Sequence, residues 1–253
     1  MDRMIFTALN ALDANRADRV SQAQNLANMQ VPGYRRDLPP VGETRFLDQL
    51  GSLDVRAFRV QDMHSRISQE PGELRQTGAD FDVAIEGYGW LYAQPEGGAP
   101  ALTRRGDLRR DPEGVLRNGA GDAMLGPDLQ PIVLPDFRSM VITDLGEIRI
   151  EPLEGAPGET VLAGLLATVG QTDGGALKRD LDGRIRALDG SVPPADQGGV
   201  VRQGVLEASN VNAVAEMVSG IEHQRGFELG MRMILTAREM DEAGSRILEA
   251  PPG

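Results

Sequence analysis

The first 28 residues carry a narrow stripe of apolar or small side chains. These recur at steps of three and four residues, with Arg16 in the one gap. The spacing predicts a helix with a seam typical of a coiled coil, rather than the wider face of a helix packed into a globular core. The helix is expected to end near Asn28, because Pro32 disfavours helical backbone in the residue before it and Gly33 readily becomes left-handed.

The last 40 residues or so return to a helical period, if Gln224, Ala237 and Gly244 are allowed to fill gaps in the apolar series. Asn210 or Asn212 is the expected N-cap. Since a helix of this kind is only marginally stable alone, each terminal helix needs a partner. The predicted seam residues are Ile5, Leu9, Leu12, Val20 and Leu26 in the first helix and Val214, Met217, Ile221, Phe227, Met231 and Ile234 in the last.

The middle of the chain has short runs rich in Val, Ile, Leu and aromatic residues, separated by turn signals. The runs are "FDVAIEGYGWLYAQ", "ALTRRGDLRR", "VLRNGAGDAML" and "PIVLP", and the turns are "DPEG", "NGAG" and "GPD". This pattern predicts a compact antiparallel β region, which continues less clearly from residue 148 to about residue 200.

The expected fold class is therefore α+β. The N- and C-terminal helices pair as a coiled-coil-like inner layer, with a central antiparallel β-rich domain between them in the chain. The expected divisions are an N-terminal assembly helix and turn (1–36), an extended connector (37–80), a β-rich central domain (81–203) and a C-terminal assembly helix (204–253).

Charge narrows the choice of partners. The net charge is −12, and Lys and Arg occur at most two in a row, so a nucleic-acid or anionic-membrane surface is not expected. Five Arg against three acidic residues give the first 36 residues +2, whereas four Arg against eight acidic residues give residues 204–253 −4. Opposite signs favour pairing of the two ends. Partners are expected to be proteins.

The chain offers no recognisable catalytic or metal site. His64 and His223 lie 159 positions apart and are expected to be ordinary surface histidines. "DLDGRIRALDG" begins like a calcium loop but has Arg184 where an oxygen ligand belongs, so two tight turns are expected. "GYGWLY" lacks the third glycine of a dinucleotide loop and predicts a turn or bulge. Cysteine is absent, which excludes disulfides and thiolate ligands. We expect no enzyme, no cofactor and no metal.

The N-terminus lacks a basic region followed by an unbroken apolar run, so it does not predict a cleaved secretory signal. No stretch approaches 18 consecutive apolar residues. Export by another route is left open.

Three ordered motifs resemble the bacterial flagellar axial proteins, the rod and hook family. "QNLANMQVPGYRRD" is similar to the family's N-terminal signature, "LEASNVNAVAEMVSGIEHQRGFEL" to its C-terminal one, and "FDVAIEGYGWLY" with "LTRRGDLRRDPEGVLRNGAGDAMLGPDLQPIVLP" to its shared central segment. Gln24, Val31 and Tyr34 depart mildly from the usual first motif. The matching positions are Asn25, Leu26, Ala27, Asn28, Gly33, Tyr34, Leu206, Glu207, Ser209, Asn210, Val211, Gln224, Arg225, Phe227 and Glu228.

The resemblance implies a structural subunit of the flagellar basal-body rod, most like the proximal type, that polymerises into the periplasmic shaft carrying torque to the hook and filament. It implies self-assembly, contact with other rod proteins, and transit through the flagellar type III export apparatus without a cleaved signal. It implies no nucleic acid, membrane insertion or small-molecule substrate. The alternatives are a distal rod or other axial protein and, from a different class, a secreted β-rich binding domain or hydrolase.

The first motif also suggests local roles. Asn25 and Asn28 are expected to satisfy backbone groups at the helix end, and Pro32–Gly33 to turn the chain. Tyr34 is expected to anchor the turn against a neighbouring subunit. The two following arginines are expected either to bind acidic partners or to form a solvated pair.

Overall fold

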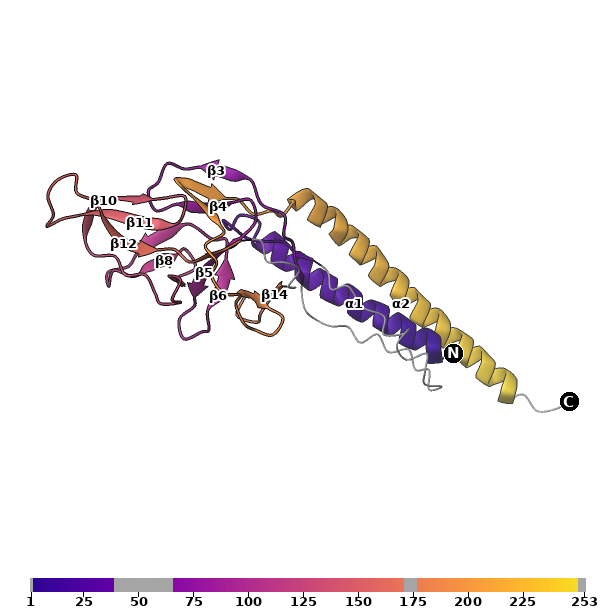
Figure 1. Ribbon diagram of the computed structural model, residues 1–253. Coiled ribbons are helices and arrows are strands. Elements are labelled where there is room, and N and C mark those ends of the chain that lie inside the picture. The colour runs from indigo at the N-terminus through magenta and orange to yellow at the C-terminus, as the bar shows by residue number, and fades with distance from the viewer. Residues whose placement is uncertain (1, 39–65, 171–176, 250–253) are drawn as a thin grey trace. The chain divides into compact units, whose positions relative to one another are not determined.

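The computed structural model describes residues 2–38, 66–170 and 177–249, with the backbone alone at 2–11, 13, 14, 241 and 244–249. Helix α1 (Asp2–Ala27) opens the chain and helix α2 (Ala213–Glu249) closes it (Figure 1). The strands between them are β1 (Asp37–Leu38), β2 (Arg66–Ile67), β3 (Leu74–Gln76), β4 (Val83–Glu86), β5 (Trp90–Gln94), β6 (Ala101–Thr103), β7 (Leu108–Arg110), β8 (Leu116–Asn118), β9 (Ala123–Met124), β10 (Phe137–Ile142), β11 (Glu147–Pro152), β12 (Val161–Leu165), β13 (Thr168–Val169), β14 (Leu177–Arg179), β15 (Ile185–Ala187), β16 (Val200–Gln203) and β17 (Val205–Glu207).

The described chain forms two compact units. A helical unit contains residues up to 26 and from 212 onward, and a β unit contains residues 27–38 and 66–211. The β unit thus takes in the end of the first predicted segment and the start of the last. The expected α+β class, with antiparallel strands between two terminal helices, is confirmed. No helix in the described ranges is long and apolar enough to cross a membrane.

Strand β5 is the centre of the β unit. The largest sheet is antiparallel and runs β1-β2-β14-β15-β6-β5-β9-β8-β7, with β13 also paired to β5. Because successive side chains of a strand point to opposite faces, Trp90 and Tyr92 enter one core cluster while Leu91 and Ala93 enter another. A strand buried on both faces explains why "WLYA" contains no charged residue.

A separate three-stranded sheet, β10-β11-β12, covers part of the core. Met140, Ile148 and Ile150 point inward and are buried, which follows from the alternation of apolar residues along β10 and β11. Val141, Arg149 and Leu162 lie opposite one another in register and are exposed. The sheet therefore has one core face and one solvent face.

The predicted turns are present. The amide of Gly114 donates to Asp111 O (3.0 Å), and that of Gly121 to Asn118 O (2.9 Å). "DLDGRIRALDG" forms the two expected tight turns, closed by Gly183 N to Asp180 O and Gly190 N to Ala187 O, both 2.9 Å.

The carboxylates of that segment are bound by an arginine. Arg186 contacts Asp180 at 3.1 Å and Asp182 at 2.8 Å. These contacts hold the pKa of Asp182 below its ordinary value, chiefly through the hydrogen bond from Arg186. The arginine occupies the carboxylates that a calcium loop would offer to a cation.

The ends of the helices follow from local sequence. Helix α1 ends at Ala27, and the amide of Val31 then donates to Asn28 O at 3.0 Å. Asn212 is the N-cap of α2, since its Oδ1 accepts from the amides of Val214 (3.0 Å) and Ala215 (3.1 Å). Of the expected connector 37–80, β1, β2 and β3 are strands, while residues 39–65, including His64, lie outside the described residues.

The two faces of the β10-β11-β12 sheet predict opposite responses to truncation. Ile148→Ala should lower the free energy of unfolding by about 2–5 kcal/mol, because Ile148 is fully buried. Val141→Ala, on the exposed face, should change it by less than about 0.5 kcal/mol. Urea denaturation of the two variants measures both values, and equal losses would contradict the assigned faces.

Candidate assembly site where the two terminal motifs meet

The β unit brings the N-terminal and C-terminal motifs into direct contact. The amide of Gly33 donates to Glu207 O at 2.7 Å, and that of Asn210 to Tyr34 O at 3.3 Å. The amide of Arg36 donates to Asn210 Oδ1 at 2.7 Å. Asn210 therefore joins the motifs rather than capping α2. Segments more than 170 residues apart in sequence are fixed in one register here.

Gly33 is required by its surroundings. Its φ is +67°, and a Cβ there would lie 2.1 Å from Arg104 O. Left-handed backbone favours glycine, and no heavy atom fits at that distance. The turn after α1 thus passes directly against the backbone at Arg104, just after β6.

Beneath this contact lies a buried ion cluster of two arginines and one glutamate. Arg35 Nη2 is 2.9 Å from Glu207 Oε1, and Arg104 Nη1 is 3.2 Å from Glu207 Oε2. All three side chains are about 1% exposed. Glu207 Oε1 also accepts from the amide of Gly72 at 2.7 Å. Of the two alternatives that the sequence left open for Arg35, the solvated pair is wrong, and the acidic partner that it binds belongs to its own chain.

Trp90 completes the cluster. The guanidinium carbons of Arg35 and Arg104 lie 5.8 and 5.9 Å from the centre of a Trp90 ring, within range of cation–π attraction. Arg104 also donates to the carbonyls of Ile85 (2.8 Å) and Gly87. These contacts explain how two cations are held around one carboxylate, although Nε of both arginines has no hydrogen-bond acceptor.

Burial disfavours the charged form of both arginines. It lowers the pKa of Arg35, with Glu207 opposing the shift. It lowers the pKa of Arg104 to about 10, again against the attraction of Glu207, while Arg35 adds to the lowering. The carboxylate of Glu207 therefore stabilises two buried cations. Its loss would leave both guanidinium groups without a counter-ion.

A second clamp fixes the residues that follow. Arg179 Nε lies 2.9 Å from Asp37 Oδ1, Arg179 Nη2 donates to Arg35 O at 2.8 Å, and its guanidinium lies 4.6 Å from the centre of the Tyr34 ring. Tyr34 is buried. It is thus anchored inside its own subunit, and the expectation that it anchors against a neighbour is wrong. Burial raises the pKa of Asp37, with Arg179 opposing the shift.

In the helical unit, α1 and α2 lie side by side (Figure 1), and hydrogen bonds of polar side chains join them. Asn15 Nδ2 donates to His223 O at 2.8 Å, Gln22 Nε2 donates to Glu216 O, and Asn25 Nδ2 is 3.4 Å from Glu216 Oε1. Asn25 and Glu216 are buried. Residue 15 of α1 pairs with residue 223 of α2, and residue 22 with residue 216. Because the residue numbers rise along α1 as they fall along α2, the two helices run antiparallel.

Glycines of α2 face α1 along the same line. A Cβ on Gly220 would lie 2.4 Å from the side chain of Gln22, and one on Gly230 would lie 3.0 Å from that of Leu12. Glycine lets α1 side chains approach the α2 backbone. His223 lies between these two glycines, half-buried, with Nε2 3.0 Å from Ser219 Oγ. The expectation that His223 is an ordinary histidine stays a prediction.

The predicted seam residues of α2 point elsewhere. Val214 is 72% exposed, Met217 59% and Ile221 55%, and Phe227 and Met231 are also exposed, while Ile234 is half-buried. In α1, Val20 is exposed, Leu12 and Leu26 are half-buried, and the side chains of Ile5 and Leu9 lie outside the described residues. Apart from Leu12, which faces Gly230, the contacts between α1 and α2 described above thus use other positions, and the seam stays a prediction.

The remaining motif positions divide between local bonding and exposure. Ser209 Oγ accepts from the amide of Val211 at 3.2 Å, and Leu206 is half-buried. The later positions lie on the exposed surface of α2; they are Gln224, Arg225, Phe227 and Glu228.

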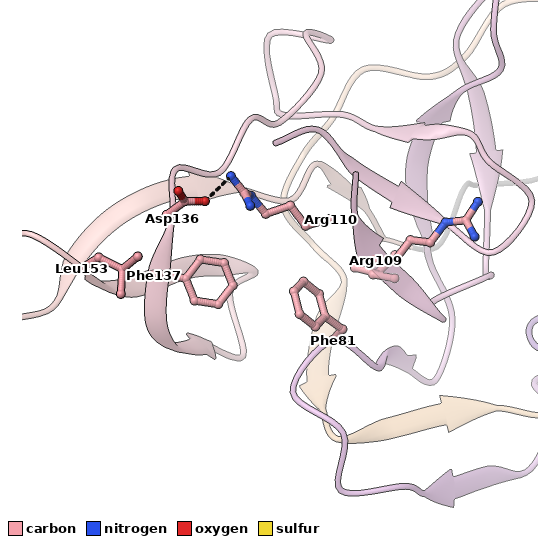
Figure 2. A pocket seen from close by; sticks show the side chains of 7 residues that line it. Phe81, Arg109, Arg110, Asp136, Phe137 and Leu153 are labelled. Atoms are coloured by element: carbon pink, nitrogen blue, oxygen red, sulfur yellow. Dashed lines mark ion pairs between the residues drawn. The ribbon is translucent and has the colours of Figure 1, made fainter. Parts of the chain in front are cut away.

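A cavity of about 430 Å³ lies elsewhere in the β unit and contains none of these motif residues (Figure 2). The rings of Phe81 and Phe137 face each other in it at 6.1 Å and 47°, and Arg110 pairs with Asp136 at 2.8 Å. Arg109 borders it, but its guanidinium points away from the rings. We assign no function to this cavity.

Three residues of the site carried no sequence signal of their own: Trp90, Arg104 and Arg179. The first two fall within segments that resemble the family's centre, but nothing in their spacing showed that they would meet Arg35. Glu207 was found as a motif residue, without its partners.

Comparisons with known proteins identify the family of this chain. A family model described as the C-terminal part of flagellar basal body rod FlgEFG proteins matches residues 202–247, from within β16 through most of α2. Flagellar basal-body rod protein FlgF of Escherichia coli (strain K12) is 35% identical over 92% of this chain and 93% of its own. FlgF of Salmonella typhimurium is 31% identical over 98% of this chain and 99% of its own.

The chain belongs to the family of flagellar basal-body rod proteins and is a structural subunit of the rod. FlgG of Agrobacterium fabrum is 26% identical over 98% of this chain and 100% of its own. The relatives named FlgF reach 28–35% identity, so FlgF is the name that matches best. These relatives give no support to the alternative of a secreted binding domain or hydrolase.

Removing the carboxylate at the centre of the cluster should be severe. Glu207→Ala should lower the free energy of unfolding by about 3–5 kcal/mol, because two buried cations lose their counter-ion. Fluorescence of Trp90, the single tryptophan, follows urea unfolding of the β unit directly. The matched control is Glu86→Ala, which breaks an exposed pair with Arg202 and should cost less than about 1 kcal/mol. Similar losses of unfolding free energy in both variants would contradict the assignment of Glu207 as the buried counter-ion of two arginines.

The close approach at Gly33 can be separated from its backbone conformation. Gly33→Ala and Gly78→Ala both place Ala at positive φ, +67° and +72°, but only the Cβ at position 33 meets another atom. Gly33→Ala should therefore cost about 1–3 kcal/mol more than Gly78→Ala. Thermal or urea unfolding of the pair measures the difference, and equal costs would show that the chain does not pass Arg104 so closely.

Proposed function

We propose that this rod subunit belongs to the proximal part of the rod and polymerises into the periplasmic shaft that transmits motor torque to the hook and filament. In that shaft the two terminal helices form the coiled-coil-like inner layer and the β unit lies outside them. Its partners are further copies of itself and neighbouring rod proteins, and it reaches them through the flagellar type III export apparatus without a cleaved signal. It acts without catalysis or a cofactor.

The observation that carries this proposal is an apolar stripe on the exposed side of α2. Val214, Met217, Val218 and Ile221 follow the i, i+3, i+4, i+7 spacing of one helix face and are 52–72% exposed. We call these four residues the outward stripe. Glu216, Gly220 and His223, on the opposite side of the helix, face α1. The outward stripe is thus left for another molecule.

The two faces of α2 contribute to stability in different ways, for a physical reason. Polar and glycine contacts hold α1 and α2 in one register but add little apolar burial, because the large side chains are turned outward. Covering those side chains in an assembly stabilises it by about 1.5–3 kcal/mol for each one fully buried. A subunit built in this way gains most of its helix stability from its neighbours.

A distal position remains the second candidate. FlgG relatives align with this chain over at least 93% of its length, so the same helices and β unit are compatible with either part of the rod. The two candidates differ in their neighbours within the shaft, not in the chemistry of the contact.

A charge within the outward stripe should block assembly without unfolding the subunit. Ile221→Asp should reduce incorporation into purified basal bodies by at least about tenfold, because a carboxylate cannot be buried in an apolar contact without a partner. Thr236→Asp adds the same charge at an exposed polar position of α2 and should incorporate normally. Quantitative immunoblotting of basal bodies, with circular dichroism of the purified chains, measures both. Normal incorporation of Ile221→Asp would contradict the proposed contact.

A further inference from the structure

A groove of about 600 Å³ lies in the β unit between the two terminal motifs. Its lining comes from Met29, Gln30 and Pro32, just after α1, from residues 206–209 and Val211, and from Arg75 and Thr77. We call it the motif groove. It is formed only where the two motifs meet, so its shape depends on the buried ion cluster around Glu207.

The lining of the motif groove is half apolar and half polar, and it includes one exposed positive charge. The apolar residues are Met29, Pro32, Leu206, Ala208 and Val211, and the uncharged polar ones are Gln30, Thr77 and Ser209. Its two ionisable residues are Glu207 and Arg75. The carboxylate of Glu207 is already bound by two arginines, whereas Arg75 is 70% exposed and has only a loose contact, 3.7 Å, with the equally exposed Glu73. An apolar segment with acidic flanks would fit.

The strands beside the groove also lack support on one side. Leu206 lies opposite Arg75 in the β17–β3 pair, which is a sheet of only two strands. Every residue of β3 is exposed. A two-stranded ribbon is marginally stable without further packing, so an occupant of the groove would stabilise it.

The outward stripe of α2 has the complementary features. Residues at i, i+3, i+4 and i+7 are the anchors by which an amphipathic helix binds an apolar groove. Helix α2 carries four arginines and seven acidic residues, a net charge of −3, which complements Arg75. The groove and the stripe are both uncovered in the described chain. Both carry apolar residues, and the charge of Arg75 is opposite to the net charge of α2.

We infer that the motif groove of one subunit receives the outward stripe of α2 from a second copy of this chain. This inference rests on the proposed function and names the surface that accepts the stripe. Groove and stripe are different surfaces, so the contact is heterologous: each copy gives a helix to one neighbour and accepts one from another. Such a contact does not close on a pair of subunits; it forms a ring or a helical array, and a shaft requires the helical array.

The absence of native cysteine allows a direct test. Met29→Cys places a thiol in the groove and Met217→Cys places one on the stripe, at residues that are 37% and 59% exposed. In basal bodies from cells that make the double variant, mild oxidation should give disulfide-linked dimers and larger species, because a disulfide needs Cα atoms within about 7 Å. Non-reducing gels with immunoblotting resolve these species.

The matched control is the double variant Leu153→Cys and Met217→Cys. Leu153 is exposed and lies at the cavity of Figure 2, away from the motif groove, so this variant should give no linked species. Linked species in both variants would show non-specific oxidation and overturn the inference. A disulfide inside one chain, or one to a different rod protein, would give the groove another occupant and would also overturn it.

The charge of Arg75 provides a second measurement. Arg75→Glu should reduce the cross-linked fraction of the Met29→Cys, Met217→Cys chain by about tenfold, since an acidic helix then meets a negative groove. Arg109→Glu, the same change at an exposed arginine outside the groove, should leave it unaltered. Equal effects of the two changes would overturn the inference.

The cysteine-free chain separates this inference from the proposed function. If that chain is present in purified basal bodies but the cysteines at 29 and 217 never link, the groove assignment fails and the rod subunit stands. If the chain is absent from basal bodies altogether, the proposed function itself fails.

Discussion

The architecture of the β unit depends on one buried carboxylate. Glu207, at the end of β17, holds Arg35 from the N-terminal motif and Arg104 from the central segment, at 2.9 and 3.2 Å. Two arginines buried without a counter-ion would be strongly destabilising. The segments that carry Arg35 and Arg104 are therefore stable in these positions only when Glu207 lies between them. The charges set the register between the motifs more than they add stability. The turn at Gly33 and the bond from Arg36 to Asn210 depend on that register.

The helical unit is held together by a different kind of contact from that of the β unit. Its inner contacts are amide and carbonyl groups, one buried glutamate and several glycines, while its largest apolar residues face outward. Polar contacts of this kind specify one arrangement of α1 against α2, because a displaced register would break the hydrogen bonds from Asn15 and Asn25 to α2. Apolar contacts give most of the free energy of burial, and Val214, Met217 and Ile221 of α2 make few of them within the subunit, since they are exposed. A rod subunit needs both a fixed register of its helices and exposed apolar residues, since it must have one structure before it joins a polymer.

The two features together suggest why the family signatures lie where they do. The N-terminal motif spans the end of α1 and the turn that enters the β unit, and the C-terminal motif spans β17 and the start of α2. Both lie where each chain end leaves the helices and enters the β unit. The motif positions inside the β unit make contacts within the subunit, whereas those on α2 after residue 223 are exposed. The signatures therefore include both residues that make contacts within the subunit and residues exposed on α2.

Sequence periodicity alone determined the order of helix, antiparallel β region and helix, the tight turns, and the end of α1 to within one residue. These features depend on local backbone preferences and on the alternation of side chains, which neighbouring residues encode. The partners of Glu207, the burial of Arg35 and Tyr34, and the choice of Asn212 over Asn210 as the cap were decided by tertiary structure. A charged residue in sequence is equally compatible with solvent and with a buried partner, and only the folded chain brings positions 35, 104 and 207 together. The inner face of α2 was hidden for the same reason, because glycine and glutamate carry no apolar signal even where they form the contact.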